Sequence, residues 1–217
     1  MVKVAVVLSG CGVYDGAEIH ESVLTLLRLA QRGATVSVFA PDIDQHHVVN
    51  HLTGEVVTDQ SRNVLTESAR IARGEIAALS TADPDAFDAL IVPGGFGAAK
   101  NLSDFASAGA ELTVEPGLLA FARALNVAAK PIGLICIAPT LAAAICGEGV
   151  ECTIGDDKET AAAVVASGAR HIRCTVGDIC IDETRRLVTT PAYMVAENIA
   201  EAAEGIFKLV DAVLARA

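Results

Sequence analysis

The sequence has no tryptophan, and aromatic residues make up only 4% of its 217 positions. It has no run of about 18 consecutive apolar residues, the length at which a membrane-spanning helix becomes a candidate. Repeats, low-complexity segments and recognisable linkers are missing too, so residues 1–217 are predicted to form one domain. The remaining composition, 52% apolar and 20% charged, is that of a compact α/β protein rather than a disordered chain.

Closely spaced cysteine pairs, which mark metal sites and redox motifs, are also absent. The chain has six cysteines but no Cys-x-x-Cys pair, which argues against a zinc ribbon or a dithiol redox motif. The apolar N-terminal stretch lacks a charged leader followed by a small-residue cleavage site, so no secretory signal peptide is expected. These features predict free thiols in a reducing compartment, and the expected location is the cytoplasm. The cysteines are Cys11, Cys136, Cys146, Cys152, Cys174 and Cys180.

Positive charge is scarce. The chain has 16 Lys and Arg residues against 27 Asp and Glu residues, which gives a formal net charge of −11 at pH 7. Such a surface repels phosphate groups, so neither nucleic acid nor a membrane surface is an expected partner. This net negative charge is compatible with a small uncharged substrate.

Apolar periodicity predicts an alternation of strands and helices. Continuous apolar runs typical of buried parallel strands alternate with stretches whose apolar residues recur at helical spacing. This predicts an α/β fold with a doubly wound, mostly parallel, flavodoxin-like sheet sandwiched by helices, and ligands at the carboxyl ends of the strands. The expected strands are 2–8, 35–40, 89–92, 131–135, 151–154, 179–181 and 187–190, with a hairpin at 50–55. The expected helices are 19–33, 64–73, 117–129, 139–145, 158–167 and 198–215.

Cys136 lies on the predicted turn between the strand ending at Ile135 and the helix that opens at Pro139. A thiolate there would meet the unpaired N–H groups of a helix N-terminus, which predicts a thiol pKa below that of a free cysteine. Cys136 is therefore the candidate nucleophile, expected to react with iodoacetamide faster than the other five cysteines at neutral pH. The alternative is a buried structural cysteine at a strand end.

Two further loops should meet Cys136 at the same edge of the sheet. Gly94 and Gly95 follow a buried strand, and their N–H groups, with that of Ile137, could form an oxyanion hole; a plain turn is the alternative. The segment at the start of the first helix carries three acidic residues, any of which can simply stabilise the helix N-terminus. Spacing does not single out one of Asp15, Glu18 and Glu21.

Six stretches, in order over nearly the whole chain, carry a family resemblance: Leu8–Gly16, Glu18–Glu21, Asn50–Glu55, Ile91–Asn101, Cys136–Pro139 and Thr189–Met194. They make the sequence similar to the ElbB-type proteins, a branch of the PfpI superfamily with the class I glutamine amidotransferase-like fold. The resemblance implies that Cys136 is the nucleophile and that Glu21, rather than Glu18, hydrogen-bonds it. The candidate oxyanion and substrate-binding residues are Gly95, Ile137, Gly94, Cys11 and Asn50; a packed loop thiol is the alternative for Cys11.

Histidine is missing where many members of that superfamily place it. An isoleucine follows the nucleophile, and the only downstream histidine, His171, does not begin the His-x-Glu of amidotransferases. These departures argue against a cysteine amidase or protease. The three histidines between residues 46 and 51 lie in predicted loop and hairpin, so no metal site is expected. His20 is expected on the surface or at the rim of the pocket.

The resemblance implies a weak glyoxalase that turns glyoxal into glycolate without glutathione or another cofactor. Cys136 would add to one aldehyde as a hemithioacetal, the N–H groups of Gly95 and Ile137 would hold the oxyanion, and Glu21 would shuttle the proton between the carbons. The superfamily also implies deglycation of glyoxal-modified groups as the underlying activity. The alternative from another class is a non-catalytic redox-sensing or ligand-binding protein.

The predicted assembly is a homodimer. The resemblance implies it, and a chain with 20% charged residues cannot cover all of its 52% apolar content. A small dicarbonyl substrate completes the expected partners.

Overall fold

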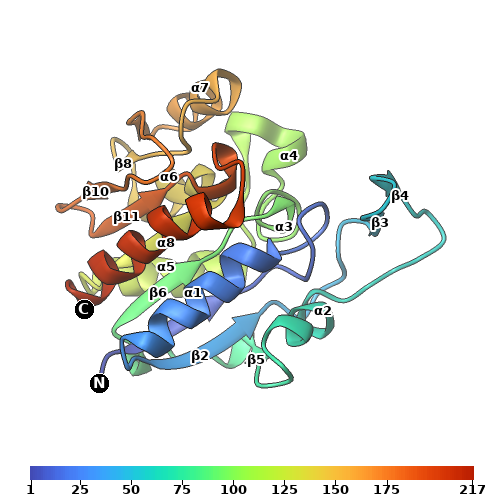
Figure 1. Cartoon of the computed structure of the whole chain (residues 1–217), viewed down its shortest axis with the longest axis horizontal. Helices are drawn as coiled ribbons and strands as arrows, with labels where there is room; N and C mark the ends of the chain where they lie inside the picture. The colour runs from blue at the N-terminus through green and yellow to red at the C-terminus, as the bar shows by residue number, and fades with distance from the viewer.

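The computed structural model describes residues 1–217. Its main sheet has seven strands: β1 (Lys3–Val7), β2 (Thr35–Ala40), β5 (Ala77–Ala78), β6 (Ala89–Val92), β7 (Ile132–Ile135), β10 (Cys180–Asp182) and β11 (Leu187–Thr190). Their order across the sheet is β10-β11-β7-β6-β1-β2-β5, and every neighbouring pair is parallel except β10 and β11 (Figure 1). The predicted doubly wound, mostly parallel sheet is confirmed.

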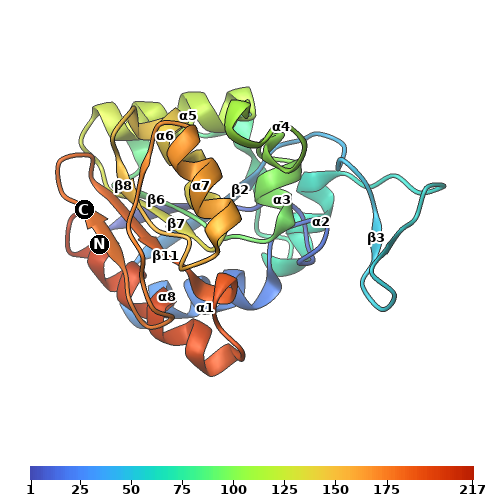
Figure 2. The same ribbon diagram turned by 90° about the horizontal axis from the view of Figure 1, so that it is seen from above.

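The α-helices are α1 (Ile19–Gln31), α2 (Val64–Ile71), α3 (Phe96–Lys100), α4 (Phe105–Ala108), α5 (Pro116–Val127), α6 (Ala142–Cys146), α7 (Lys158–Ala166) and α8 (Ile199–Leu214). Figure 2 shows α1 and α8 on one face of the sheet and α5 and α6 on the other. Side chains alternate along each strand, so Val4 and Val6 join the core under α1 and α8, while Ala5 and Val7 join the core on the opposite face. None of the helices combines the length and the apolar character that crossing a bilayer needs.

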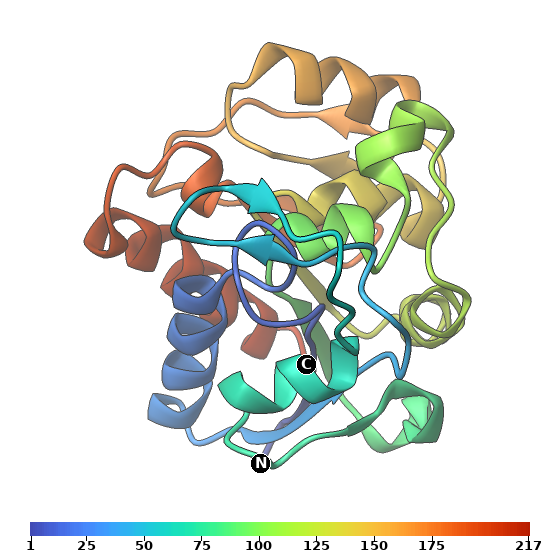
Figure 3. The ribbon, with the colours of Figure 1, turned by 90° about the vertical axis from the view of Figure 1, so that its right-hand side faces the viewer.

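Two small sheets lie outside the main one. The predicted hairpin is formed by β3 (Val49–Asn50) and β4 (Glu55–Val56), and it projects from the body beside the loop that follows β1 (Figures 1 and 3). The strand expected at 151–154 is shorter, β8 (Glu151–Cys152), and pairs with β9 (Arg170–His171) instead of the main sheet. In the main sheet the position next to β11 is taken by β10.

Four central strands, β1, β6, β7 and β11, end at the same edge of the sheet because they run parallel. The sequence predicted three loops there: the segments after β1, β6 and β7. The structure adds the segment after β11, a 3-10 turn at Ala192–Met194. The glycine-rich turn after β6 is also shorter than expected, since α3 begins directly after Gly95.

Candidate active site

Cys136 occupies a strained turn directly after β7. Its φ of 63° lies in the left-handed region that side chains other than glycine seldom adopt, and its N–H donates to the carbonyl of Thr190 at 2.9 Å. The chain then continues as a 3-10 turn over Ala138–Leu141 before α6 begins. The strain holds the sulfur at the end of the sheet, facing the N–H groups of Gly95 and Ile137.

Glu21 lies beneath the sulfur and is fully buried in the first turn of α1. Its carboxyl group hydrogen-bonds Cys136, Oε2 accepts from the N–H of Gly94 at 2.9 Å, and Oε1 accepts from the N–H of Tyr193 at 3.3 Å. Glu18 instead caps α1, since its Oε2 accepts from the N–H of Glu21 at 2.7 Å. The structure therefore brings Glu21, and not Glu18, against the candidate nucleophile.

Gly94 and Gly95 serve different purposes. The N–H of Gly94 is already bonded to Glu21, so the prediction that it contributes to an oxyanion hole is wrong. A Cβ at Gly94 would lie 2.5 Å from Cβ of Cys136 and 2.8 Å from Oε2 of Glu21, so only glycine permits this approach. Gly95 has a φ of 92°, and its N–H faces the sulfur together with that of Ile137. These two groups are the available oxyanion donors.

Glu21 and Cys136 form a pair of buried, hydrogen-bonded ionisable groups. Burial raises the pKa of Glu21 to about 8, and the negative charge of Glu18 acts in the same direction. Burial also raises the pKa of the Cys136 thiol well above its ordinary value, with the Glu21 carboxylate as the second cause, while the N–H groups of Gly95 and Ile137 lower it. At neutral pH the carboxyl group is therefore mostly protonated and can donate to sulfur.

The prediction of a depressed thiol pKa at Cys136 is wrong. Cys136 is only 7% exposed, its hydrogen-bonded neighbour Glu21 is a carboxylic acid, and the helix after this turn is short and preceded by a 3-10 turn. Such a helix offers little macrodipole to offset the loss of hydration. Preferential alkylation of Cys136 at neutral pH consequently loses its basis.

Glu21→Gln should change how stability depends on pH. The pKa of Glu21 rises from an ordinary 4.5 to about 8, so between these values the folded protein keeps a proton that the unfolded chain releases. This contribution is fully present below the unfolded pKa and is lost as pH rises, at up to about 1.4 kcal/mol per pH unit. Gln has no such proton. Raising the pH from about 5 to about 8 should therefore lower the free energy of unfolding, measured in urea, more in the wild type than in the variant. An equal pH dependence in the two proteins would contradict a protonated, buried Glu21.

A cavity of about 370 Å³ opens above the sulfur. It is lined by Val13, Glu18, Gly95, Phe96, Cys136, Ile137, Asp157, Thr160, Tyr193 and Met194. Six of the lining residues were not singled out from the sequence: Val13, Phe96, Asp157, Thr160, Tyr193 and Met194. Tyr193 and Met194 belong to a shared family stretch that directly follows a buried strand, and that position was the available signal.

Cys11 and Asn50 do not line this cavity. The thiol of Cys11 lies near Glu67 and Arg70 of α2, where burial raises its pKa. Asn50 is exposed in β3, and its Oδ1 accepts from the N–H of Leu52 at 3.0 Å, which shapes the hairpin turn. The structure therefore places neither Cys11 nor Asn50 at the cavity above Cys136, and their binding roles stay predictions.

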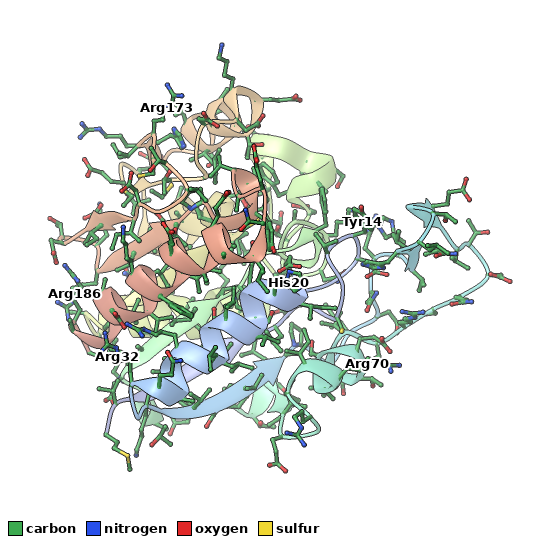
Figure 4. The ribbon with its side chains drawn as sticks, viewed as in Figure 1. Tyr14, His20, Arg32, Arg70, Arg173 and Arg186 are labelled. Carbon is green, nitrogen blue, oxygen red and sulfur yellow. The ribbon has the colours of Figure 1, made fainter.

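Asp15, His47 and His51 have partners outside the cavity. Asp15 Oδ2 accepts from the N–H of Val49 at 2.7 Å and so anchors the hairpin. Nε2 of His51 accepts from the N–H of Tyr14 at 3.2 Å, and Nε2 of His47 lies 3.0 Å from Nζ of Lys100. His20 is exposed at the start of α1, and its ring points toward the segment after β11 (Figure 4).

Solved structures share this architecture. An isoprenoid biosynthesis protein with an amidotransferase-like domain from Ehrlichia chaffeensis matches with a TM-score of 0.93 and 33% identity, over 100% of this chain and 99% of that one. Glyoxalase III of Candida albicans has the same fold, with a TM-score of 0.61 and 17% identity over 99% of this chain and 97% of its own. The fold is therefore that of the class I glutamine amidotransferase-like superfamily, which includes the DJ-1 and PfpI proteins.

Sequence relatives narrow the class to a family, although no protein-family model matches the chain. The rat (Rattus norvegicus) "ES1 protein homolog, mitochondrial" is 47% identical over 98% of this chain and 83% of its own length. The human (Homo sapiens) "Glutamine amidotransferase-like class 1 domain-containing protein 3, mitochondrial" is also 47% identical, over 98% of this chain and 82% of its own. This chain belongs to the ES1 family.

The same relatives contradict the prediction of a cytoplasmic location, because they are mitochondrial proteins. Free thiols fit any reducing compartment, so they do not distinguish the cytoplasm from other such compartments.

Proposed function

We propose that this protein is a glutathione-independent glyoxalase that converts glyoxal to glycolate. The observation that carries the proposal is the contact between the buried carboxyl group of Glu21 and the sulfur of Cys136, at the base of a cavity with two N–H groups aimed at the sulfur. A nucleophile, an oxyanion site and a proton shuttle are what this isomerisation requires. The same thiol could release glyoxal from modified groups, which makes deglycation a variant of one chemistry.

In the proposed reaction the ionised fraction of Glu21, whose pKa is about 8, takes the proton of the Cys136 thiol, which leaves a thiolate held by the N–H groups of Gly95 and Ile137. The sulfur adds to one aldehyde carbon, and the new oxygen takes the place facing these donors. Glu21, again a carboxylate once its proton has passed to that oxygen, removes the hydrogen from this carbon and delivers it to the second one. Water then hydrolyses the thioester and releases glycolate.

A redox sensor fits the site less well. Sensor cysteines combine a low thiol pKa with exposure to solvent, whereas Cys136 is 7% exposed and burial raises its pKa. A fully buried carboxyl group that bonds the sulfur also has no evident purpose in a sensor. Turnover of glyoxal by the purified protein, without glutathione or added metal, tests the proposal; its absence at every pH from about 6 to about 9 would refute it.

The charge of the cavity should select among dicarbonyl substrates. Glu18 and Asp157 line it, and no Lys, Arg or His does. Repulsion between one such carboxylate and an anionic substrate is worth about 1 kcal/mol, or roughly fivefold, near a solvated surface. We therefore expect 4-carboxyphenylglyoxal to have a several-fold lower kcat/KM than phenylglyoxal, measured by initial rates of product formation.

Asp157→Asn should narrow this difference while preserving the fold. Asp157 caps α7 by accepting from the N–H of Thr160 at 2.8 Å, and asparagine caps helices equally well. Its neighbour Asp156 pairs with Arg173 outside the cavity, so Asp156→Asn is the matched control. Equal rates for the two substrates in the wild type would refute charge selection.

We further propose that the protein is a homodimer. Three apolar side chains of α1, Ile19, Val23 and Leu27, are spaced four residues apart and remain 43%, 48% and 45% exposed. A second copy of the chain would cover this stripe. Light scattering should give twice the chain mass of 22.3 kDa; a monomer at micromolar concentration would contradict the assembly.

A further inference from the structure

Tyr193 joins the catalytic pair to a histidine at the mouth of the cavity. Its side chain lines the cavity, and its backbone N–H donates to Glu21. Its hydroxyl oxygen lies 2.7 Å from Nδ1 of His20, and the two rings are tilted at 45° with centroids 5.8 Å apart. His20 itself is exposed to solvent. Tyr193 thus places its hydroxyl between the cavity and an exposed histidine.

The backbone before Tyr193 is strained as well. Five residues other than glycine have positive φ, and Arg73 and Ala129 follow helix ends, where this conformation is common. Arg186 lies in the turn between β10 and β11. The remaining two are Cys136, at 63°, and Ala192, at 42° and fully buried. Such strain clusters at functional sites, and here one strained residue is Cys136 itself while the other directly precedes Tyr193.

We propose that Tyr193 is a second acid–base residue of this site and that His20 positions and reprotonates it. The inference rests on the glyoxalase function proposed above. It supplies the proton carrier that the site otherwise lacks, because no histidine lines the cavity. Glu21 alone would have to move a proton between carbons while the oxygen of the second aldehyde went without an acid.

The chemistry balances with these groups. After the sulfur has added to the first aldehyde, Glu21 takes the hydrogen of that carbon, and the electron pair forms a carbon–carbon double bond. The oxygen of the second aldehyde then receives the proton of the Tyr193 hydroxyl, which gives an enediol. Nδ1–H of His20 stabilises the phenolate and returns a proton to it, and the ring regains one from water. Protonated Glu21 delivers its proton to the second carbon, the first hydroxyl loses its proton to water, and the thioester forms.

The surroundings keep Tyr193 in the protonated form that an acid needs. Burial raises the pKa of its hydroxyl, and the negative charges of Glu18 and Glu21 act in the same direction. No positive charge at the cavity opposes this effect. The Lys100 ammonium donates to the carbonyl of Tyr14, lies 3.0 Å from Nε2 of His47 and does not line the cavity.

Tyr193→Phe tests the inference because it keeps the ring and the backbone N–H that holds Glu21. We expect kcat for glyoxal to fall about 100-fold, while the rate at which Cys136 gains the mass of one glyoxal stays within about twofold of the wild type. The chain has one other tyrosine, Tyr14, which also contacts a histidine, 5.0 Å between ring centroids, but lies outside the cavity. Tyr14→Phe is therefore the matched control and should keep wild-type kcat.

His20→Ala should lower kcat about tenfold, and imidazole in the buffer should restore it, since the vacated position faces solvent. A purely structural contact would not respond to imidazole. Wild-type kcat in Tyr193→Phe, an equal loss in Tyr14→Phe, or no rescue by imidazole would overturn the inference. If the wild type forms no adduct on Cys136 and no glycolate, the proposed function itself fails, which is a distinct result.

Discussion

Cys136→Ser is expected to abolish the conversion of glyoxal to glycolate. The sulfur is the only nucleophile that faces both the N–H groups of Gly95 and Ile137 and the carboxyl group of Glu21. A serine hydroxyl in the same place has no adjacent base strong enough to ionise it, so loss of the covalent route should cost about 10⁴-fold or more in kcat. Steady-state assay of glycolate formation measures this loss.

A suitable control for this variant is Cys174→Ser. Cys174 is half-buried and free, and it lies outside the cavity that contains Cys136. Its replacement should leave turnover unchanged. Residual activity of Cys136→Ser above about one per cent, with the fold verified by thermal unfolding, would mean that another group performs the addition.

Glu21→Gln should stop the reaction after the first bond has formed. Loss of an acid–base group typically costs 10²–10⁴-fold, about 3–5 kcal/mol of barrier, whereas loss of a helix-stabilising acid costs only about 1 kcal/mol of folding stability. The amide oxygen can still accept from the N–H of Gly94, so the packing is largely kept. Addition of Cys136 to glyoxal should still occur, though more slowly because glutamine cannot take the thiol proton, and glycolate formation should stop.

Glu18→Gln is the control that separates proton transfer by Glu21 from the effect of removing one negative charge at the start of α1. Both residues lie at the same helix end, but Glu18 caps the helix and only Glu21 hydrogen-bonds the sulfur. An equal loss of turnover in the two variants would show that the assignment to Glu21 is wrong. Full activity in both would make the carboxyl group structural.

Much of the fold follows from the sequence because its strands are continuous apolar runs separated by clear breaks. The run at 35–40 corresponds residue for residue to β2, and the turn expected at Cys136 follows β7 directly. The pairing of Cys136 with Glu21 was predictable only through the family resemblance. Acidic residues at the start of a helix can also be explained by their stabilisation of the helix N-terminus.

The electrostatics of the site could not be predicted from the sequence. The position of Cys136 before a helix suggested a low thiol pKa, but burial and the Glu21 carboxylate dominate in the folded protein. Two tertiary contacts were equally unpredictable: the hydrogen bond from the N–H of Gly94 to Glu21, and the packing of the Cys11 loop against α2. Tyr193 went unnoticed because its partner, His20, is 173 positions away in the chain.

The most direct test of the proposed chemistry is a single-turnover reaction of the wild-type protein with one equivalent of glyoxal. Aliquots are quenched over time, and peptide mapping and glycolate quantification are performed on each. We expect an adduct confined to Cys136 that decays at the rate at which glycolate appears. Glycolate that forms without any adduct on Cys136, or an adduct that persists without glycolate, would contradict covalent catalysis at this site.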